Sequence, residues 1–299
     1  MTLPTFYIAG AGRSGSTSLE AYCRAHPEIF MPSIKEPNYF IFGHAGFRAG
    51  GPQGAHRNRT SIRSLKKYKA LFRDAGDAKA IGEGSVSYLA YPEACAGIRE
   101  LTPHAKLIFI LRQPVDRAFS SYQKFSESVP DPAGSFEAAW RDHERRMTEN
   151  WFTAQYKRKS LYYEQLKVWL DSFDKNQIRI YLYEDLRADP KALMRDLYEF
   201  VGVDPSFDPN VSIVHNRRGE IANPILRWTW RNSEDLRSWV APHLPLSWRG
   251  QFFRLIARGE RASPGERLDP ALRAQLTEEI KDDILKTQDL IGRDLSHWL

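Results

Sequence analysis

The sequence predicts an α/β fold: a single three-layer domain with a central parallel sheet flanked by helices, followed by C-terminal helices. Short apolar runs typical of buried strands occur at 6–9, 106–111 and 178–183. Segments with the helical spacing of apolar residues separate these runs, which favours a parallel sheet covered on both faces. Polar residues suited to chemistry follow the strands, at the edge where such sheets bind ligands.

The length and composition fit one large domain over 1–299, with a helical part from about 220 to 299. Of the 299 residues, 42% are hydrophobic and 12% aromatic, which excludes wholesale disorder. A net charge of +6 suits an anionic nucleotide, nucleic acid or a membrane surface and does not discriminate among them. Two cysteines make neither a disulfide framework nor a zinc site. With no signal peptide or transmembrane segment expected, we predict a cytoplasmic protein.

Strands and helices are expected to alternate along the chain. Leu19, Tyr22 and Cys23 lie on one face of a first helix, which closes before Pro27 because proline disfavours helical geometry in the preceding residue. A polar, glycine-rich stretch at 43–58 is the best candidate for a mobile loop. The further expected elements are helices at 64–72, 91–101, 114 onward to 173, 190–202 and after 216, and strands at 79–83, 106–111 and 178–183.

Residues 10–17 form a predicted anion-binding loop at the start of the first helix. Gly10, Gly15 and Thr17 match the G-x-x-x-x-G-K-[ST] spacing of P-loops, but Ser16 stands at the lysine position. Glycine lets backbone amides turn inward, and the helix dipole favours negative charge there. Arg13 is the one cation of the loop. The fold is therefore P-loop-like, with a phosphate site that is unusual for an ATPase or GTPase.

A second candidate phosphate contact follows the strand at 106–111. Arg112 stands at the carboxyl end of that strand, and Ser120 lies about two turns into the next helix. Both can point toward the sheet edge that carries the anion-binding loop, and a guanidinium with a hydroxyl suits phosphate oxygens. The alternative is that Arg112 pairs with Asp116 and Ser120 lies on a solvated face. Position alone does not decide between them.

Several of these segments resemble one family. GAGRSGSTSL at 10–19 and LIFILRQPVDRAFSSY at 107–122 look like the two nucleotide-binding signatures of sulfotransferases that use 3′-phosphoadenosine 5′-phosphosulfate (PAPS). KEPNYF at 35–40, YLYEDLRADP at 181–190 and the closing GRDLSHWL resemble further family segments. The signature pair in this order is specific, whereas either one alone would be weak. The resemblance implies transfer of a sulfuryl group to a hydroxyl, without a metal.

The resemblance also implies which positions bind the donor. For the 5′-phosphosulfate it implies Arg13, Ser14, Gly15, Ser16 and Thr17, with Arg13 standing where many members have lysine. For the 3′-phosphate it implies Arg112 and Ser120, and for the adenine Tyr183. A basic loop that closes over the 3′-phosphate is matched by Arg217, Arg218 and Gly219.

Glu36 is the predicted general base. In the glycan-modifying branch that KEPNYF resembles, a glutamate takes the proton of the acceptor hydroxyl. An alcohol is a poor nucleophile until that proton leaves, and burial near Tyr39 and Phe40 would raise the pKa of the carboxyl for this task. The alternative is that Glu36 only forms an ion pair, for instance with Lys35.

Two histidines are alternative bases, because members acting on steroids and phenols use histidine. His26 precedes a proline at a helix end, which favours a structural role, whereas His215 lies beside the predicted basic loop.

One segment departs from the heparan-type pattern. GEGSVSY at 82–88 resembles E-K-[ST]-P-x-Y but has Gly84 where those members carry a lysine beside the sulfuryl group. This leaves Arg13, helped by Lys35, to neutralise charge on the departing oxygen. A close relation to bacterial members is the expectation.

Three other functions are weighed. A P-loop kinase or NTPase needs a lysine at position 16 and an acidic magnesium ligand after a strand, but Ser16 and Arg112 stand there. A nucleic-acid-binding protein needs clustered basic residues with exposed aromatics, whereas the basic residues here are spread along the chain. A catalytically inactive nucleotide-binding member is disfavoured by the presence of both Glu36 and Arg112. The expected acceptor is a glycan, a glycolipid or a small natural product, and no nucleic acid partner is expected.

Overall fold

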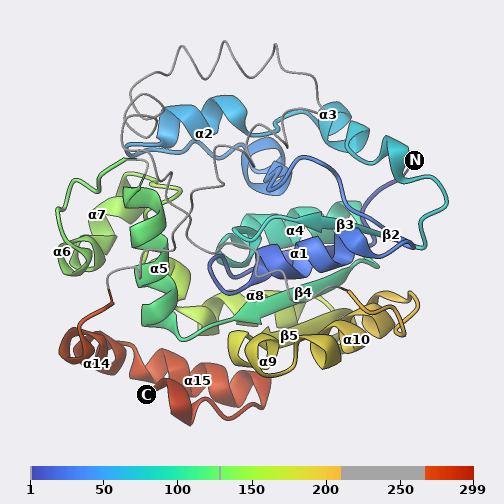
Figure 1. Ribbon diagram of the computed structural model, residues 1–299. Coiled ribbons are helices and arrows are strands. Elements are labelled where there is room, and N and C mark those ends of the chain that lie inside the picture. Colours follow the sequence, from blue (N-terminus) through green and yellow to red (C-terminus); the bar gives the residue numbers. More distant parts are fainter. Residues whose placement is uncertain (1, 128, 210–266) are drawn as a thin grey trace, which may run out of the picture. The chain divides into compact units, whose positions relative to one another are not determined.

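The computed structural model describes residues 2–127, 129–209 and 267–299 (Figure 1), and the described residues up to 209 form one compact unit with 268–299. At the centre of this unit is a parallel sheet with the strand order β2-β3-β1-β4-β5. The chain builds β2 and β3 on one side of β1 and then β4 and β5 on the other, so its direction reverses beside β1. Ligands bind at such a switch point. The strands are β1 (Phe6–Gly10), β2 (Ile29–Phe30), β3 (Ala80–Gly84), β4 (Lys106–Leu111) and β5 (Ile178–Leu182).

Helices cover both faces of the sheet (Figure 1). Those on one face are α1 (Ser16–Ala25) and α10 (Pro190–Val201), and those on the other are α4 (Pro92–Leu101) and α8 (Tyr162–Ser172). Proline opens α4 and α10, where its missing amide proton costs no helical hydrogen bond. The other α-helices of the described residues are α2 (Gly54–Thr60), α3 (Leu65–Ala70), α5 (Pro114–Ser126), α6 (Phe136–Arg141), α7 (His143–Thr148), α9 (Tyr183–Ala188), α14 (Pro270–Glu279) and α15 (Lys281–Ile291).

The apolar run of β4 serves both faces. Leu107, Phe109 and Leu111 pack in the core cluster that contains α4 and α8, whereas Ile108 and Ile110 pack with α1 and α10. Successive side chains of a strand point to opposite faces, so a continuous apolar run is what a parallel strand covered on both sides requires. The predicted three-layer α/β fold is confirmed.

Most predicted elements agree with the structure within one or two residues, and the strand at 178–183 shows where they differ. It ends at Leu182, whose amide donates to the Asp185 carboxylate at 2.8 Å as the chain turns into α9. Tyr183 therefore begins a helix. The sequence did not predict strand β2, because only two of its residues pair with β3 and two residues are too few to show a strand pattern.

The prediction of a loop over 43–58 is wrong in part. A π-helical turn, Phe40–His44, overlaps its start, and α2 overlaps its end. The side chain of Asn58 bonds both the amide and the carbonyl of Ala49, at 2.9 and 2.8 Å. Arg63 donates to the carbonyl oxygens of Phe42 and Phe47, at 2.9 and 3.1 Å. These side chains satisfy backbone groups that an open loop would leave to water.

The C-terminal helices hold the starts of α8 and α5. The carboxylate of Asp283 on α15 accepts the amides of Tyr162 and Tyr163 at 2.8 and 3.2 Å. Gln113, which caps α5, donates to Thr277 Oγ1 on α14 at 3.0 Å. Within the described ranges, no helix combines the length and apolar character needed to cross a bilayer. The single domain through residue 299 stays a prediction.

Candidate active site

The anion-binding loop connects β1 directly to α1. Gly15 has a φ of 96°, and a Cβ at this position would lie 2.5 Å from Leu186 Cδ2. Only glycine meets both conditions. The first amides of α1, beginning at Ser16, have no acceptor within the helix, and they point with the helix dipole toward the loop. The backbone therefore offers an anion site at the carboxyl edge of β1.

Ser14 lies inside this loop and fits such an anion. Its side chain is fully buried, and its Oγ has no hydrogen-bond partner among the described residues. A buried hydroxyl left without a partner costs about 1–3 kcal/mol. An oxygen of a bound phosphate or phosphosulfate would remove this cost, so the loop suits the group that the sequence predicts for it.

Arg13 joins the loop to the second predicted phosphate contact. Its Nε donates a hydrogen bond to Ser120 Oγ at 3.1 Å, and Arg112 Nη1 donates to the Arg13 carbonyl oxygen at 3.2 Å. These residues come from β1–α1, the end of β4 and the middle of α5. The structure thus brings the predicted 5′ and 3′ contacts into one cluster of positive charge.

Tyr183 belongs to the same cluster. The guanidinium of Arg112 lies over its ring, 4.9 Å from the centroid. The alternative partner of Arg112 is engaged elsewhere, since Asp116 pairs with Arg273 at 3.0 Å. Arg112 is therefore held by an aromatic face and a carbonyl oxygen, which leaves its charge to act on a ligand.

Arg117 is a member of the cluster that the sequence analysis does not single out. It is buried on α5, donates to Ser160 Oγ and the Tyr156 carbonyl oxygen at 2.8 Å each, and lies 3.5 Å from the Gly12 carbonyl oxygen. Burial, together with the neighbouring guanidinium groups of Arg112 and Arg13, lowers the pKa of Arg117 to about 10. It stays charged at neutral pH. Its place within LIFILRQPVDRAFSSY is the signal that could have found it.

Glu36 lies in a turn that is bound to the end of β3. Glu36 and Asn38 have φ values of 50° and 49°, which are uncommon for residues other than glycine. The Glu36 amide donates to the Gly84 carbonyl at 3.1 Å, and the Asn38 amide donates to Ser85 Oγ at 3.0 Å. The Asn38 side chain closes the turn onto the Glu36 carbonyl at 2.9 Å. Backbone outliers of this kind cluster at functional sites.

The expectation that Tyr39 and Phe40 bury the Glu36 carboxylate is wrong. Both rings turn into the core and pack against Tyr68, with centroid distances of 4.5 and 5.4 Å. Glu36 itself is only half-buried. The turn at Glu36 and Asn38 directs Tyr39 and Phe40 into the core and leaves Glu36 nearer the surface.

The fully buried carboxylate of this region is Glu83. The hydroxyls of Tyr68 and Tyr88 donate to its Oε2 at 2.7 and 3.1 Å. Burial raises the pKa of Glu83 to about 7, although these hydrogen bonds and that of Ser85 oppose the shift. Two tyrosine hydroxyls thus hold Glu83, which comes directly before Gly84 and Ser85, the two residues that bind the Glu36 turn.

Lys35 and the position of Gly84 border the same carboxylate, that of Glu20. The Lys35 Nζ donates to Thr17 Oγ1 at 2.6 Å and lies 3.6 Å from Glu20 Oε2. A Cβ at Gly84 would lie 3.1 Å from that same Glu20 oxygen. Lys35 thus brings a cation to the anion-binding loop from another segment, and its ion pair is with Glu20 rather than Glu36.

His26 lies at the far end of α1 from the loop. Its Nδ1 accepts the Glu28 amide at 3.1 Å, so its Nε2 donates to the Asp204 carbonyl at 3.0 Å, and the ring packs on Tyr198. Ten helical residues span about 15 Å, which separates His26 from the anion site and gives it a structural role. The remaining predicted positions lie outside the described residues: His215, Arg217, Arg218 and Gly219.

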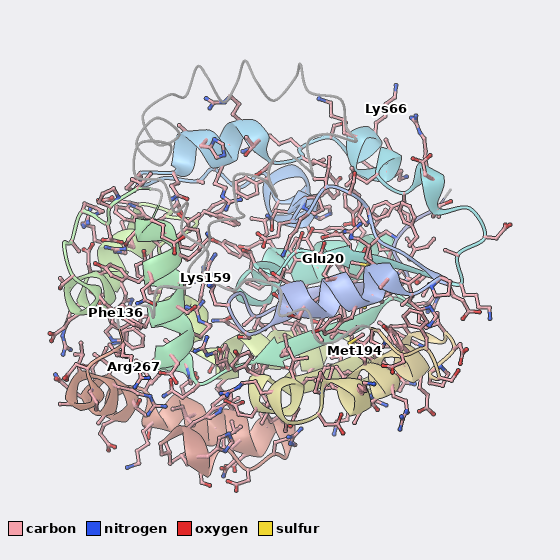
Figure 2. All side chains as sticks on the ribbon, viewed as in Figure 1. Glu20, Lys66, Phe136, Lys159, Met194 and Arg267 are labelled. Carbon is pink, nitrogen blue, oxygen red and sulfur yellow. The ribbon has the colours of Figure 1, made fainter. Side chains whose placement is uncertain are left out.

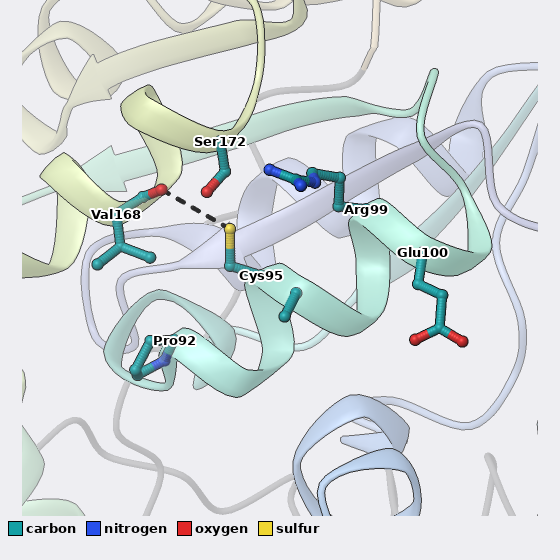
Figure 3. A pocket seen from close by; sticks show the side chains of 7 residues that line it. Pro92, Cys95, Arg99, Glu100, Val168 and Ser172 are labelled. Carbon is teal, nitrogen blue, oxygen red and sulfur yellow. Dashed lines mark hydrogen bonds between the residues drawn. The ribbon is translucent and has the colours of Figure 1, made fainter.

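Two hollows of the described part of the chain lie away from these residues. One, of about 440 Å³, lies between α4 and α8 (Figure 3) and includes Cys95, Arg99 and Ser172. Burial raises the pKa of the Cys95 thiol, which disfavours the reactive thiolate form. The other, of about 520 Å³, lies beside α3. Across the described residues, no three His, Cys, Asp or Glu side chains could together hold a metal ion.

Comparison with curated proteins finds sulfotransferases. The chain is 23% identical to the membrane-associated sulfotransferase kil1 of Dictyostelium discoideum, over 79% of this chain and 65% of that protein. It is 26% identical to carbohydrate sulfotransferase 15 of Homo sapiens, over 68% of this chain and 44% of that protein. It is 26% identical to heparan sulfate glucosamine 3-O-sulfotransferase 3A1 of Mus musculus, over 67% of this chain and 46% of that protein. The chain thus spans about half to two thirds of the length of these relatives.

A solved structure matches the whole chain. The sulfotransferase from Alicyclobacillus acidocaldarius superposes with a TM-score of 0.77 at 28% identity, covering 100% of this chain and 99% of that one. The model of the sulfotransferase family matches residues 4–209, which include the anion-binding loop, Glu36 and the Arg112–Ser120 segment. Neither the kinase nor the nucleic-acid alternative finds support in these matches. This chain belongs to the sulfotransferase family.

Proposed function

We propose that this protein transfers a sulfuryl group from PAPS to a hydroxyl of a glycan, a glycolipid or a small natural product. The observation that carries the proposal is the contact of Arg13 with both Ser120 and Arg112. A nucleotide phosphorylated at both its 3′ and 5′ positions needs two anion sites close together, and a nucleotide phosphorylated only at 5′ needs one. Membership of the family supports this donor.

The donor side has two groups of residues. Arg112 and Ser120 would bind the 3′-phosphate, with Tyr183 beside the adenine. Arg117 holds the Gly12 carbonyl and adds a positive charge behind the loop. The 5′-phosphosulfate would be held by Arg13, Ser14, Gly15, Ser16 and Thr17.

Positive charge at the loop favours departure of the phosphate. When bound, the donor supplies an electrophilic sulfur, and negative charge grows on the bridging oxygen as the sulfuryl group leaves. Arg13 and the first amides of α1 stabilise this charge in a preorganised way. Lys35 adds a cation through Thr17, in place of the lysine that is missing at position 84.

Glu36 would act as the general base. Glu36 is not fully buried, so an acceptor could reach it, and its turn is fixed to Gly84 and Ser85 through hydrogen bonds. A carboxylate held in place next to the attacking hydroxyl accepts the proton as the new S–O bond forms.

A sugar is our first choice of acceptor, because the relatives include carbohydrate and heparan sulfate sulfotransferases. For the location we propose the cytoplasm, because both cysteines, Cys23 and Cys95, are unpaired.

The proposal is tested by comparing nucleotides and then by transfer. The product nucleotide 3′-phosphoadenosine 5′-phosphate should raise the melting temperature, and ATP with magnesium should not. Radiolabelled PAPS should then label a hydroxyl acceptor in a screen of saccharides, glycolipids and natural products. Equal stabilisation by ATP and the 3′-phosphorylated nucleotide would contradict the donor assignment.

A further inference from the structure

The positive charge of the chain is concentrated directly after Glu36. Residues 37–73 contain eight lysines and arginines and no aspartate or glutamate, in a chain with 43 basic and 37 acidic residues. The rest of the chain therefore carries two more acidic than basic residues. This corrects the expectation that the basic residues are spread along the chain. A segment with one sign of charge repels itself, and an anionic partner relieves that repulsion.

The inner part of this basic segment lies against residues 150–159. Gly50 and Trp151 form a parallel bridge, and the Gly50 amide donates to the Asn150 carbonyl at 2.8 Å. Arg57 on α2 lies over the Phe152 ring, 5.7 Å from its centroid. Two cationic stretches, far apart in the sequence, therefore meet.

Lys159 (Figure 2) and its neighbour Arg158 both lie over the Tyr91 ring at this meeting point. Lys159 Nζ lies 4.4 Å from the centroid of Phe152 and 5.5 Å from that of Tyr91, and it donates to the Phe152 carbonyl at 2.6 Å. Arg158 lies over Tyr91 at 4.9 Å and donates to a glutamine side-chain oxygen and a carbonyl oxygen at 2.7 Å each. Within the described ranges, rings and neutral oxygens hold these cations, and no carboxylate does.

The charges around Lys159 interact with both Glu36, the proposed base, and the anion-binding loop. Burial and the guanidinium groups of Arg158, Arg117 and Arg57 lower the pKa of Lys159 well below its usual range, and the Glu36 carboxylate opposes the shift. Arg117 in turn lies 3.5 Å from the Gly12 carbonyl of the anion-binding loop. The cations thus lie within electrostatic reach of the proposed base.

We propose that Arg57, Arg158 and Lys159 bind an anionic group of the acceptor, a carboxylate, sulfate or phosphate beside the hydroxyl that is modified. This inference rests on the proposed function, because it takes Glu36 to mark the acceptor side. An anion bound there would form charge-assisted hydrogen bonds and relieve the repulsion among the three cations.

The test uses the full chain saturated with 3′-phosphoadenosine 5′-phosphate, so that the donor site is filled. Binding of isomaltotriose and of its carboxymethyl, sulfate and phosphate derivatives is measured by calorimetry at fixed ionic strength. The variant Arg57→Gln/Arg158→Gln is compared with Lys66→Gln/Lys67→Gln. The control removes the same charge from exposed positions of the basic segment, and Figure 2 shows Lys66 at the outer edge, away from Lys159.

We expect at least one anionic derivative to bind about tenfold tighter than isomaltotriose or better, and the derivative preferred identifies the anion. The Arg57/Arg158 variant should lose about tenfold or more of that affinity, and the Lys66/Lys67 control no more than about twofold. Equal binding of neutral and anionic saccharides would overturn the proposal. So would an equal loss in both variants, which indicates general attraction, or tighter binding of a single-stranded DNA oligonucleotide than of any saccharide.

The donor site provides an independent readout. Stabilisation by 3′-phosphoadenosine 5′-phosphate should be unchanged in the Arg57/Arg158 variant, since neither residue belongs to the donor cluster. A wild-type protein that binds anionic saccharides but is not stabilised by this nucleotide would refute the proposed donor and leave the cation cluster standing. The two failures are therefore distinguishable.

Discussion

The Nε of Arg13 lies 3.1 Å from the Oγ of Ser120, across 107 positions of the chain. This hydrogen bond joins the loop after β1 to the middle of α5. It brings together two sequence segments that each resemble a phosphate contact. Substitutions in the loop and substitutions near Ser120 should therefore both affect binding of the same nucleotide, the first through its 5′ end and the second through its 3′-phosphate.

Arg112→Ala should weaken binding of the 3′-phosphorylated nucleotide specifically. A hydrogen bond to a charged group contributes about 1.5–3 kcal/mol, so we expect a loss of about tenfold to a hundredfold for 3′-phosphoadenosine 5′-phosphate. Binding of adenosine 5′-phosphate should change little. Calorimetric titration of both nucleotides measures the difference, and Arg179→Ala, on β5, is the control. An equal loss for both nucleotides would contradict a 3′-phosphate contact.

Glu36→Gln should abolish transfer while leaving donor binding nearly intact. The amide keeps the shape of the side chain but cannot accept the hydroxyl proton, and loss of a general base costs about 10²–10⁴ in rate. Transfer of radiolabelled sulfate and nucleotide-induced melting shifts are measured on the same preparations. Glu93→Gln, an exposed substitution on α4, serves as the control. A donor affinity that falls in parallel with the rate would refute the role of Glu36 as base.

Glu83 should make the protein less stable as the pH rises toward neutrality. The pKa of its carboxyl is raised from 4.5 to about 7, so between these values the folded state keeps a proton that the unfolded state has released. The contribution of Glu83 to the free energy of unfolding should therefore be largest below pH 4.5. It should fall by about 3 kcal/mol as the pH rises from 4.5 through 7.

Glu83→Gln should remove this contribution, because the amide does not titrate. Urea unfolding at pH 5 and pH 8 measures the difference, and the variant should lose less stability between the two than the wild type. Glu93→Gln should follow the wild type. A wild type and a Glu83→Gln variant with the same pH dependence would show that Glu83 does not hold the proton.

Gly15→Ala and Gly202→Ala separate backbone strain from crowding. Both glycines have positive φ, at 96° and 87°, but a Cβ at Gly15 would lie 2.5 Å from Leu186 whereas nothing lies within 4 Å at Gly202. Gly202→Ala should cost about 1–2 kcal/mol of stability from backbone conformation alone.

Gly15→Ala should add an overpacking cost of about 1–3 kcal/mol and should also weaken nucleotide binding, because the anion-binding loop must shift. Urea unfolding and nucleotide-induced melting shifts measure the two effects. If both variants lost the same stability and both bound nucleotide normally, Leu186 would not constrain the loop.

The elements that were easiest to predict carry strong local patterns. The strand β4 is a continuous apolar run, and α5 and α10 begin at prolines that mark a first helical turn. The anion-binding loop was recognisable because glycines at fixed spacing have few other uses between a strand and a helix. Tyr183 was misplaced because the hydrogen bond from Leu182 to Asp185 turns the chain, and no local pattern announces it.

Local sequence patterns are enough to predict the α/β class, the anion-binding loop and the resemblance to sulfotransferases, because periodicity and motif spacing are properties of neighbouring residues. Tertiary structure decided which residues meet. It buried Glu83 rather than Glu36, brought Lys35 to Thr17 of the loop, and added Arg117 to the cluster. The physical reason is that burial and electrostatic contact depend on the distance between segments far apart in the chain, and that distance exists only in the folded protein.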